Sequence, residues 1–393
     1  RTPTMRCGMC CGRCAPRFGG GRADRARPVP GRILVVWRFV SGSCLQLDTG
    51  ERISAMGTGQ VEPTAVAGAN PIIVGIDGSE LAGRAVPVAA AIALARGASL
   101  LVVRVVGRAL SSEIFGVEVD AYLHARDKAA AEVTHVVDAI QAAHPSLNVQ
   151  GILTEGSASL ELLRVQEDSG ASLIVLTSHG RTALARTMRG SVAEDVVRGS
   201  RRPVLVLWPW ALPDVGPTRA AGVVFSSAKL PGRNVLVPLD GSGRTLHAVG
   251  AAFRFARVAG GSIVLTTALD VNTMTSPSAR ILEQAVRRAL DDRAAVITQA
   301  GVPCRVEVVL ASDPTDAIVG LASREECDVI AMTTHARGSI GRFLLGGVAS
   351  HVQARASRSV ILVPPHAEEW SGTSDLPDAV RALAHAEDVV IKG

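Results

Sequence analysis

The segment PIIVGIDGS, residues 71–79, decides the fold, because the chain repeats it as NVLVPLDGS at residues 234–242. Each segment is a short, unbroken apolar run that ends in an Asp-Gly-Ser turn. Unbroken apolar runs are typical of strands that are covered on both faces, as in a parallel sheet. The repetition predicts two domains of the same kind in one chain.

A second block repeats near the other end of each copy. LIVLTSHGRTALARTMRGSVA at 173–193 corresponds to VIAMTTHARGSIGRFLLGGVA at 329–349, and RRPVLVLW at 201–208 corresponds to SRSVILVP at 357–364. Between these blocks, apolar runs alternate with stretches of helical periodicity, of which the first is interrupted by Pro87. Alternation of this kind, with right-handed crossovers, predicts an open doubly wound α/β sheet with helices on both faces.

These repeats predict five parts of the chain. They are a leader over 1–68, a first domain over 69–210, a linker over 211–232, a second domain over 233–366 and an acidic tail with one short helix over 367–393.

The positive charge of the chain lies in its leading segment. The whole chain has 41 Lys plus Arg against 36 Asp plus Glu, but ten arginines and only three acidic residues fall within 1–55. The remainder is therefore close to neutral and gives no support for a nucleic-acid partner. No apolar run approaches the roughly 18 residues that a membrane helix needs, so we expect no membrane association and a cytoplasmic location.

The leading segment is also rich in cysteine. The run CGMCCGRC at 7–14 places two CxxC pairs side by side, which is a thiolate set that zinc accepts. No spacer separates the pairs and no histidine is near, so compositional bias is the favoured interpretation and no metal site is predicted. We expect residues before Met56 to be disordered or absent from the native product, with translation beginning at Met56. Cys304 and Cys327 are expected to be buried free thiols.

The first candidate site lies where the first strand of each copy ends. In an open α/β sheet, ligands bind beyond the carboxyl ends of the strands, and Asp77 and Asp240 occupy that position. A carboxylate there can accept hydrogen bonds from ribose hydroxyls or an amino group. The same residues also fit an Asp-Gly turn that caps the next helix, and the residues alone leave both interpretations open.

The second candidate is the loop after the fourth strand. His179, Gly180 and Arg181 leave that strand, and Gly190 and Ser191 open the next helix. Glycines let backbone N–H groups approach an anion, and a helix N-terminus adds a positive dipole end, so this loop fits a phosphate cradle. The alternative is structural, because Ser191 and the glutamate three residues later form a capping box that stabilises a helix without a ligand.

Common catalytic signatures are missing from the sequence. It has no GxxxxGK[ST], no GxGxxG after the first strand, no GxSxG and no HExxH. His179 and His335 lie at strand ends, where a structural role is favoured over that of a general base. No catalytic residue is predicted.

Taken together, VGIDGS, the T-x-H-G-R-type turn, GSVAEDVV and PVLVL, in two copies, resemble the universal stress protein family in its tandem two-domain form. The resemblance extends from about Ala69 to Pro365. It implies two Rossmann-like (adenine nucleotide α-hydrolase-like) domains, each with an open five-stranded parallel sheet of order 3-2-1-4-5. In many members it also implies ATP, bound between the first-strand Asp and the glycine loop before the last helix.

Carried over position by position, the resemblance implies a nucleotide site in the first domain, with Arg181, Arg186 and Arg189 adding positive charge beside the phosphates. The matching residues are Asp77, Gly156, Gly180, Arg181, Gly190, Ser191 and Val192. The sequence departs from the family pattern at Ala183, where the second glycine of the turn would be.

The second domain matches less well. Asp240, Gly346 and Val348 fit the pattern, but Ala336 and Ser339 replace both turn glycines. Gly347 replaces the hydroxyl residue that contacts phosphate, while Gly338 and Gly341 keep the loop flexible. We therefore expect the first domain to bind nucleotide more tightly.

The resemblance implies an ATP-binding module, with or without Mg²⁺, that uses the nucleotide as a signal of energy state or as a clamp on conformation. Hydrolysis is expected to be slow or absent. A scaffold or interaction protein with degenerate nucleotide sites is the alternative, and an enzyme of the wider adenine-nucleotide α-hydrolase-like group is a third, against which the missing catalytic loop counts. The closing strands at 204–207 and 360–362 need covering, so an intramolecular pseudo-dimer, and a homodimer of such chains, is expected.

Overall fold

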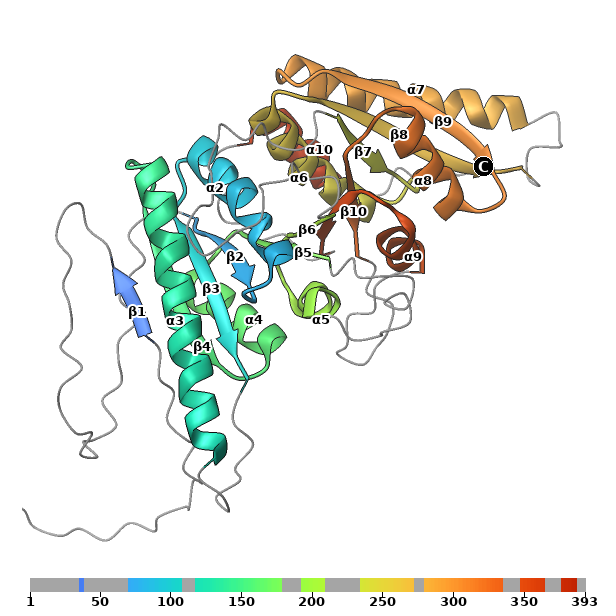
Figure 1. Cartoon of the computed structure of the whole chain (residues 1–393). Helices are drawn as coiled ribbons and strands as arrows, with labels where there is room; N and C mark the ends of the chain where they lie inside the picture. The colour runs from blue at the N-terminus through green and yellow to red at the C-terminus, as the bar shows by residue number, and fades with distance from the viewer. Residues whose placement is uncertain are drawn as a thin grey trace, which may run out of the picture. The chain divides into compact units, whose positions relative to one another are not determined.

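The computed structural model describes residues 35–38, 70–107, 117–178, 192–208, 234–271, 279–334, 347–364 and 376–386 (Figure 1). The strands are β1 (Val35–Arg38), β2 (Ile72–Ile76), β3 (Leu100–Val106), β4 (Val149–Glu155), β5 (Leu173–Thr177), β6 (Val204–Leu207), β7 (Asn234–Pro238), β8 (Ser262–Asp270), β9 (Cys304–Ala311), β10 (Val329–Thr333) and β11 (Ser359–Val363). The helices are α1 (Glu80–Gly83), α2 (Ala85–Arg96), α3 (Val117–Ala143), α4 (Ala158–Ser169), α5 (Val192–Gly199), α6 (Gly243–Ala259), α7 (Ala279–Gln299), α8 (Pro314–Arg324), α9 (Gly347–Arg355) and α10 (Asp378–Ala384).

The two copies have the same strand order. In the first, β4, β3, β2, β5 and β6 are neighbours in that sequence, and in the second the order is β9, β8, β7, β10 and β11. All pairings within each copy are parallel. This is the predicted order 3-2-1-4-5, and it is confirmed in both copies. It places the ends of the first and fourth strands side by side, which is where a ligand site of this fold lies.

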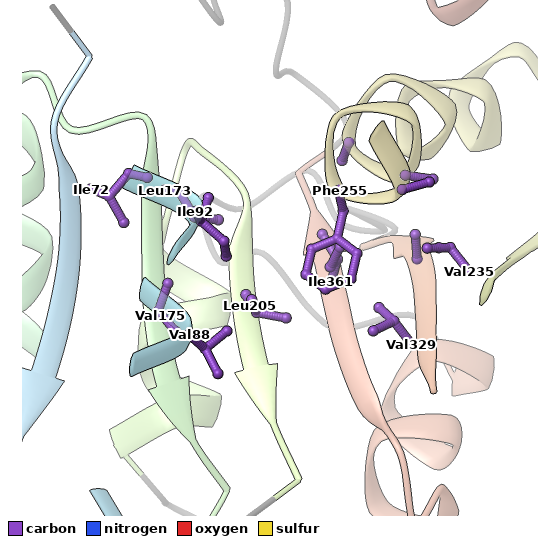
Figure 2. Packing of buried hydrophobic residues seen from close by; sticks show 14 of the residues in the cluster. Ile72, Val88, Ile92, Leu173, Val175, Leu205, Val235, Phe255, Val329 and Ile361 are labelled. Carbon is purple, nitrogen blue, oxygen red and sulfur yellow. The ribbon is translucent and has the colours of Figure 1, made fainter. Parts of the chain in front are cut away.

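The two closing strands pair with each other. β6 and β11 run antiparallel, with Leu205 opposite Ile361, so the strands of both copies belong to one sheet. The backbone N–H of Trp208 also donates to the Ser359 Oγ at 3.1 Å. Figure 2 shows Leu205 and Ile361 in one buried apolar cluster that includes Phe255 of α6 and Ile92 of α2. Each closing strand therefore covers the edge of the other.

One strand was not predicted. β1 lies in the segment assigned to the leader and pairs antiparallel with β4, with Val36 opposite Ile152. The apolar run that contains it stops at Arg38, which made it too short to recognise. The first domain therefore has a sixth, antiparallel strand beside its five parallel ones. The start of translation at Met56 stays a prediction, and residues 7–14 lie outside the described residues.

The first helical segment is divided in the first copy and continuous in the second. Pro87 was expected to interrupt the first of them, and the structure has α1 end at Gly83 and α2 begin at Ala85, so that Pro87 falls in a first turn. Proline is tolerated there, because a first-turn N–H has no partner within the helix. In the second copy the corresponding residue is Gly250, and α6 is continuous.

The predicted short helix of the tail is α10, which packs on α6. Leu376, Val380 and Ala384 of this segment are buried. A Cβ added to Gly250 would lie 3.3 Å from the Leu376 Cδ1, so this glycine allows the close approach of the tail. Among the described helices, none is both long and apolar enough to cross a membrane.

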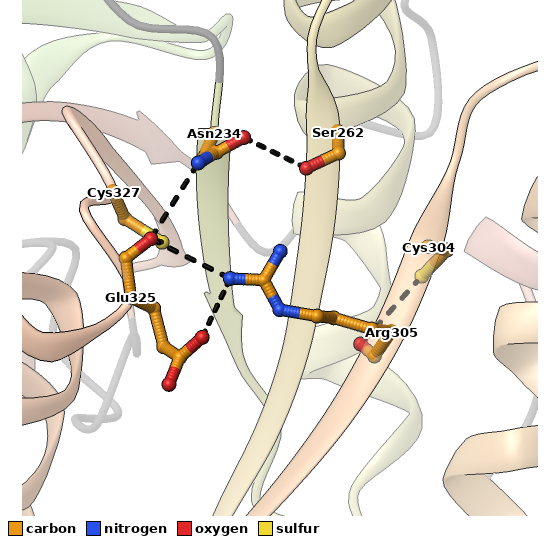
Figure 3. A network of polar contacts seen from close by, with 6 residues as sticks. All are labelled: Asn234, Ser262, Cys304, Arg305, Glu325 and Cys327. Carbon is orange, nitrogen blue, oxygen red and sulfur yellow. Dashed lines mark hydrogen bonds and ion pairs between the residues drawn. The ribbon is translucent and has the colours of Figure 1, made fainter.

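A polar network joins the amino ends of the second copy's strands (Figure 3). The Arg305 guanidinium of β9 donates to the Glu325 Oε2 at 2.6 Å, and the Ser262 Oγ of β8 donates to the Asn234 Oδ1 of β7 at 2.8 Å. Both cysteines of this region are free. Cys327 is buried as predicted, but Cys304, on the outer strand β9, is only half-buried. Burial raises the pKa of Cys304 to about 12 and that of Cys327 to about 11.

Candidate functional site

A hollow lies at the carboxyl ends of β2, β3 and β5 in the first copy. It holds about 580 Å³ of space, including the part that opens to solvent. Its described lining residues are Gly75, Ile76, Asp77, Ala82, Val103, Arg104, Val105, Ala158, Leu162, Leu176, Thr177, Val192 and Ala193. Two of the predicted site residues, Asp77 and Val192, are therefore brought to one hollow from segments more than a hundred residues apart in the sequence.

Asp77 stands in a turn that the local sequence builds. Its Oδ1 accepts from the Ser79 backbone N–H at 2.8 Å, and the Ser79 Oγ accepts from the Ala82 N–H at 3.1 Å, which caps α1. Gly78 has a φ of +77°, which favours glycine. The turn-and-cap interpretation is thus realised, and the Asp77 side chain is at the same time exposed along the hollow.

An ion pair that the sequence did not reveal stands beside this turn. The Arg104 Nε of β3 lies 3.4 Å from the Glu132 Oε2 of α3, and the Arg104 Nη1 donates to the Val105 carbonyl at 3.1 Å. A Cβ added to Gly78 would lie 2.7 Å from the Glu132 Oε2, so the carboxylate sits against the turn. Arg104 thus balances the negative charge of Glu132 close to the turn that holds Asp77. The available signal was that Arg104 is the one charged residue in the apolar run 100–106.

Gly156 follows β4 but does not occur among the described lining residues of the hollow. Its φ of +147° and its neighbour Glu161 explain why a glycine stands there, since a Cβ would lie 3.1 Å from the Glu161 Oε1. Glu161 is held in place by the Thr154 Oγ1 and the Arg164 Nη1, each at 2.9 Å from its Oε2. The structure therefore gives Gly156 a local role, while its predicted contact with nucleotide stays a prediction.

The N-terminus of α5 lies at the hollow, because its first two residues, Val192 and Ala193, are among the lining residues. A helix N-terminus offers free N–H groups and a positive dipole end to an anion. Glu194 forms an ion pair with Arg198 one turn later. The remaining predicted cradle residues, Gly180, Arg181, Gly190 and Ser191, together with Ala183, Arg186 and Arg189, lie outside the described residues.

The corresponding turn of the second copy is held by several side-chain contacts. Gly241 has a φ of +84°, and the Asp240 Oδ1 accepts from the Ser242 backbone N–H at 2.9 Å and from the Ser242 Oγ at 2.6 Å. The Thr245 Oγ1 lies 3.1 Å from the same oxygen. Gly347 is exposed and Val348 is half-buried at the start of α9, while Gly338, Gly341 and Gly346 lie outside the described residues.

A metal site and a second hollow are the remaining features that bear on ligands. No group of three or more His, Cys, Asp or Glu side chains in the described ranges is arranged to hold a metal ion. A second hollow of about 370 Å³, including the part that opens to solvent, lies near the amino ends of β5 and β6. It is lined by Arg96 and Arg254 together with Ile92, Leu173, Pro203, Leu205, Ala251, Phe255 and Ile361, and none of the described predicted site residues is among them.

Comparison with known proteins identifies relatives of both copies. The family model for the universal stress protein family matches residues 68–207 and 232–364. A universal stress protein of Methanocaldococcus jannaschii is 39% identical over 59 residues, which is 15% of this chain and 36% of that protein. One of Mycobacterium tuberculosis is 30% identical over 136 residues, covering 35% of this chain and 44% of that protein. The chain thus spans less than half the length of either relative.

Among solved structures, a universal stress protein from Archaeoglobus fulgidus is similar over 75% of this chain and 96% of its own, with a TM-score of 0.54 and 20% identity. At this identity the likeness concerns the fold alone.

Proposed function

Because the chain belongs to the universal stress protein family, with two copies of the family's domain in one polypeptide, we propose that it binds ATP in its first domain. We take it to act in the cytoplasm as a nucleotide-dependent regulatory module in a stress or energy-state response. The observation that carries the proposal is the meeting of Asp77 and the N-terminus of α5 in one hollow at the carboxyl edge of the sheet.

The walls of the hollow suit the three parts of a nucleotide. The Asp77 carboxylate accepts hydrogen bonds from ribose hydroxyls, and the N-terminus of α5 attracts phosphate. Val103, Val105 and Leu162 supply an apolar surface for the base.

Slow or absent hydrolysis is part of the proposal. Phosphoryl transfer requires groups that hold a metal ion and orient a water molecule. In the described part of the hollow, Arg104 is engaged by Glu132, and Asp77 is the one carboxylate among the lining residues. A regulatory role of the bound nucleotide therefore fits this site better than turnover, with Mg²⁺ as an optional companion of the phosphates.

A scaffold role is the second candidate, and one observation favours it for the second domain. Gly347 stands where the first domain has Ser191, so the second domain lacks the hydroxyl that the family resemblance places at the phosphate. The antiparallel pairing of β6 with β11 supports an intramolecular pseudo-dimer as the unit of this scaffold. A homodimer of two chains is a further expectation, which the mass of the protein in solution would test.

Equilibrium binding of ATP to the purified full chain tests the proposal. We expect saturable binding by the wild type and at least about tenfold weaker binding by Asp77→Ala, since the carboxylate would contact the ribose. The matched control is Asp138→Ala, which removes an exposed carboxylate of α3 and should bind as the wild type does. If the wild type shows no saturable binding, or if Asp77→Ala and Asp138→Ala bind equally well, the nucleotide proposal fails.

A further inference from the structure

The Asp-Gly-Ser turn of the first domain is bordered by a carboxylate, whereas the turn of the second domain is open at the same place. Gly78 and Gly241 have similar φ values of +77° and +84°. A Cβ added to Gly78 would lie 2.7 Å from the Glu132 Oε2 and 2.9 Å from the Glu132 Oε1, while no described atom lies within 4 Å of a Cβ added to Gly241. The two turns thus have a similar backbone but differ in what supports them from outside.

The helix that carries Glu132 is fixed on the sheet. Val133 and Val137 of α3 are 0% and 1% exposed, and a Cβ added to Gly151 of β4 would collide with the Val133 Cγ1. A helix that packs this closely on a strand cannot shift without losing buried contacts. The backbone of Glu132, one residue before Val133, therefore has a set position relative to β4.

The Glu132 side chain is held by Arg104. The Arg104 Nε lies 3.4 Å from the Glu132 Oε2, and the Arg104 Nη1 donates to the Val105 carbonyl at 3.1 Å. Arg104 stands opposite Ile76 in the pairing of β2 with β3, and Ile76 directly precedes Asp77. The side chains of Arg104 and Glu132 are 21% and 25% exposed, so water screens their attraction only in part. The ion pair therefore joins β3 and α3 beside the turn.

A different residue occupies the corresponding place in the second domain. The strand pairings put Thr267 of β8 where the first domain has Arg104 of β3. The Thr267 Oγ1 donates to the Leu239 carbonyl at 2.9 Å. A neutral hydroxyl bonded to the neighbouring backbone does not form an ion pair with a helix. Between these two equivalent positions, the ionic tie to a helix is thus a property of the first domain.

We infer that Arg104 and Glu132 are positioning residues, which together hold the turn of Asp77 in the geometry that binds the nucleotide. An exposed turn that contains glycine has many accessible conformations, and ordering it on binding costs free energy. Two partners on rigid elements reduce that cost before the ligand arrives. The inference rests on the proposed ATP binding, and the effect it assigns to Arg104 passes through Glu132 and not through contact with the nucleotide.

Calorimetric titration of the full chain with ATP tests the inference. Arg104→Met and Glu132→Gln should each weaken binding about three- to tenfold, and the double variant should bind no more weakly than the weaker single variant, because either change alone breaks the pair. The matched control is Arg305→Met, which removes a strand arginine of the second domain that is paired with Glu325 and should leave ATP binding unchanged. If thermal unfolding shows Arg104→Met to be unfolded, Arg104→Lys takes its place, since lysine keeps the charge and lacks the Nε.

Amide hydrogen exchange of the peptide 72–84, measured without ATP, separates the positioning role from a general loss of stability. Both single variants should exchange faster than the wild type in this peptide, while the buried strand at 173–177 should keep its rate. Unchanged exchange at 72–84, unchanged ATP affinity of both single variants, losses of affinity that add in the double variant, or stronger ATP binding by Glu132→Gln would overturn the inference alone. Absence of ATP binding by the wild type would overturn the proposed function, and the exchange rates would then decide by themselves whether the pair holds the turn.

Discussion

Replacing Leu205 by alanine should destabilise both domains, because this side chain lies where the two copies share one core. Leu205 is completely buried on β6, opposite Ile361 of β11. Removing its side chain beyond Cβ forfeits a transfer free energy of about 2 kcal/mol. A cavity term adds about 1–2 kcal/mol, since Leu205 already borders the hollow that residues of both copies line and the wall is not expected to collapse fully. We expect a loss of about 3–4 kcal/mol in the free energy of unfolding.

Urea denaturation measures this loss, followed in parallel by far-ultraviolet circular dichroism and by tryptophan fluorescence. Trp208, one of four tryptophans, lies one residue beyond β6 and bonds to Ser359, so it adds to the emission a contribution that depends on the pairing of the closing strands. The control is Leu160→Ala, which truncates a leucine of α4 that is 66% exposed and should change stability by less than about 0.5 kcal/mol. Equal stabilities of the Leu205 and Leu160 variants would refute the assignment of β6 to a shared core.

Three further outcomes are expected. Gly78→Ala should cost more stability in urea than Gly241→Ala, by up to about 1 kcal/mol, because both residues have positive φ but only at Gly78 must the added Cβ move a carboxylate, that of Glu132, away from Arg104; equal costs would contradict the ion-pair geometry beside the turn. Cys327, with its pKa raised to about 11 by burial, should react with iodoacetamide at pH 8 about 100-fold more slowly than a free thiol, as measured by peptide mapping, and fast labelling of the folded protein would show that it is not buried. The pKa of Asp313 is lowered chiefly by the hydrogen bond from the Thr315 N–H, which caps α8. The contribution of this cap to stability should therefore be present above the ordinary aspartate pKa and lost as the pH falls through the lowered value. Asp313→Asn should lessen the drop in the urea midpoint between pH 7 and pH 3, and an unchanged drop would count against this cap.

The strands and the doubly wound class of the sheet could be predicted from features that are local in sequence, whereas the strand order followed from the resemblance to the universal stress protein family. Each strand is an unbroken apolar run, and the repetition of the blocks around Asp77 and Asp240 requires both domains to share one topology. The same local patterns give the buried face of α6, where Leu246, Val249 and Phe253 recur at helical spacing and are all buried.

The details around the site could not be predicted, because they depend on contacts between distant elements. The Arg104 and Glu132 ion pair joins a strand to a long helix, and nothing in the spacing of the two residues indicates which face of the helix meets the strand. The contact of the Thr245 hydroxyl with Asp240 is equally hidden, since a threonine in the first turn of a helix has several local partners.

The pairing of β6 with β11 gives the second domain a structural role that does not involve a ligand. All four residues of β6 are buried, and without β11 this strand would present unpaired N–H and carbonyl groups along an apolar edge, which favours aggregation. Loss of nucleotide binding in the second domain would therefore leave its structural contribution intact. On this argument Asp240→Ala should leave ATP binding by the first domain unchanged and should lower the free energy of unfolding by about 1 kcal/mol, because it removes hydrogen bonds of a single turn on an exposed residue. Leu205→Ala should lower the free energy of unfolding severalfold more than Asp240→Ala does. If Asp240→Ala has the larger effect, the second domain contributes to stability through the turn at Asp240 and not through the shared sheet.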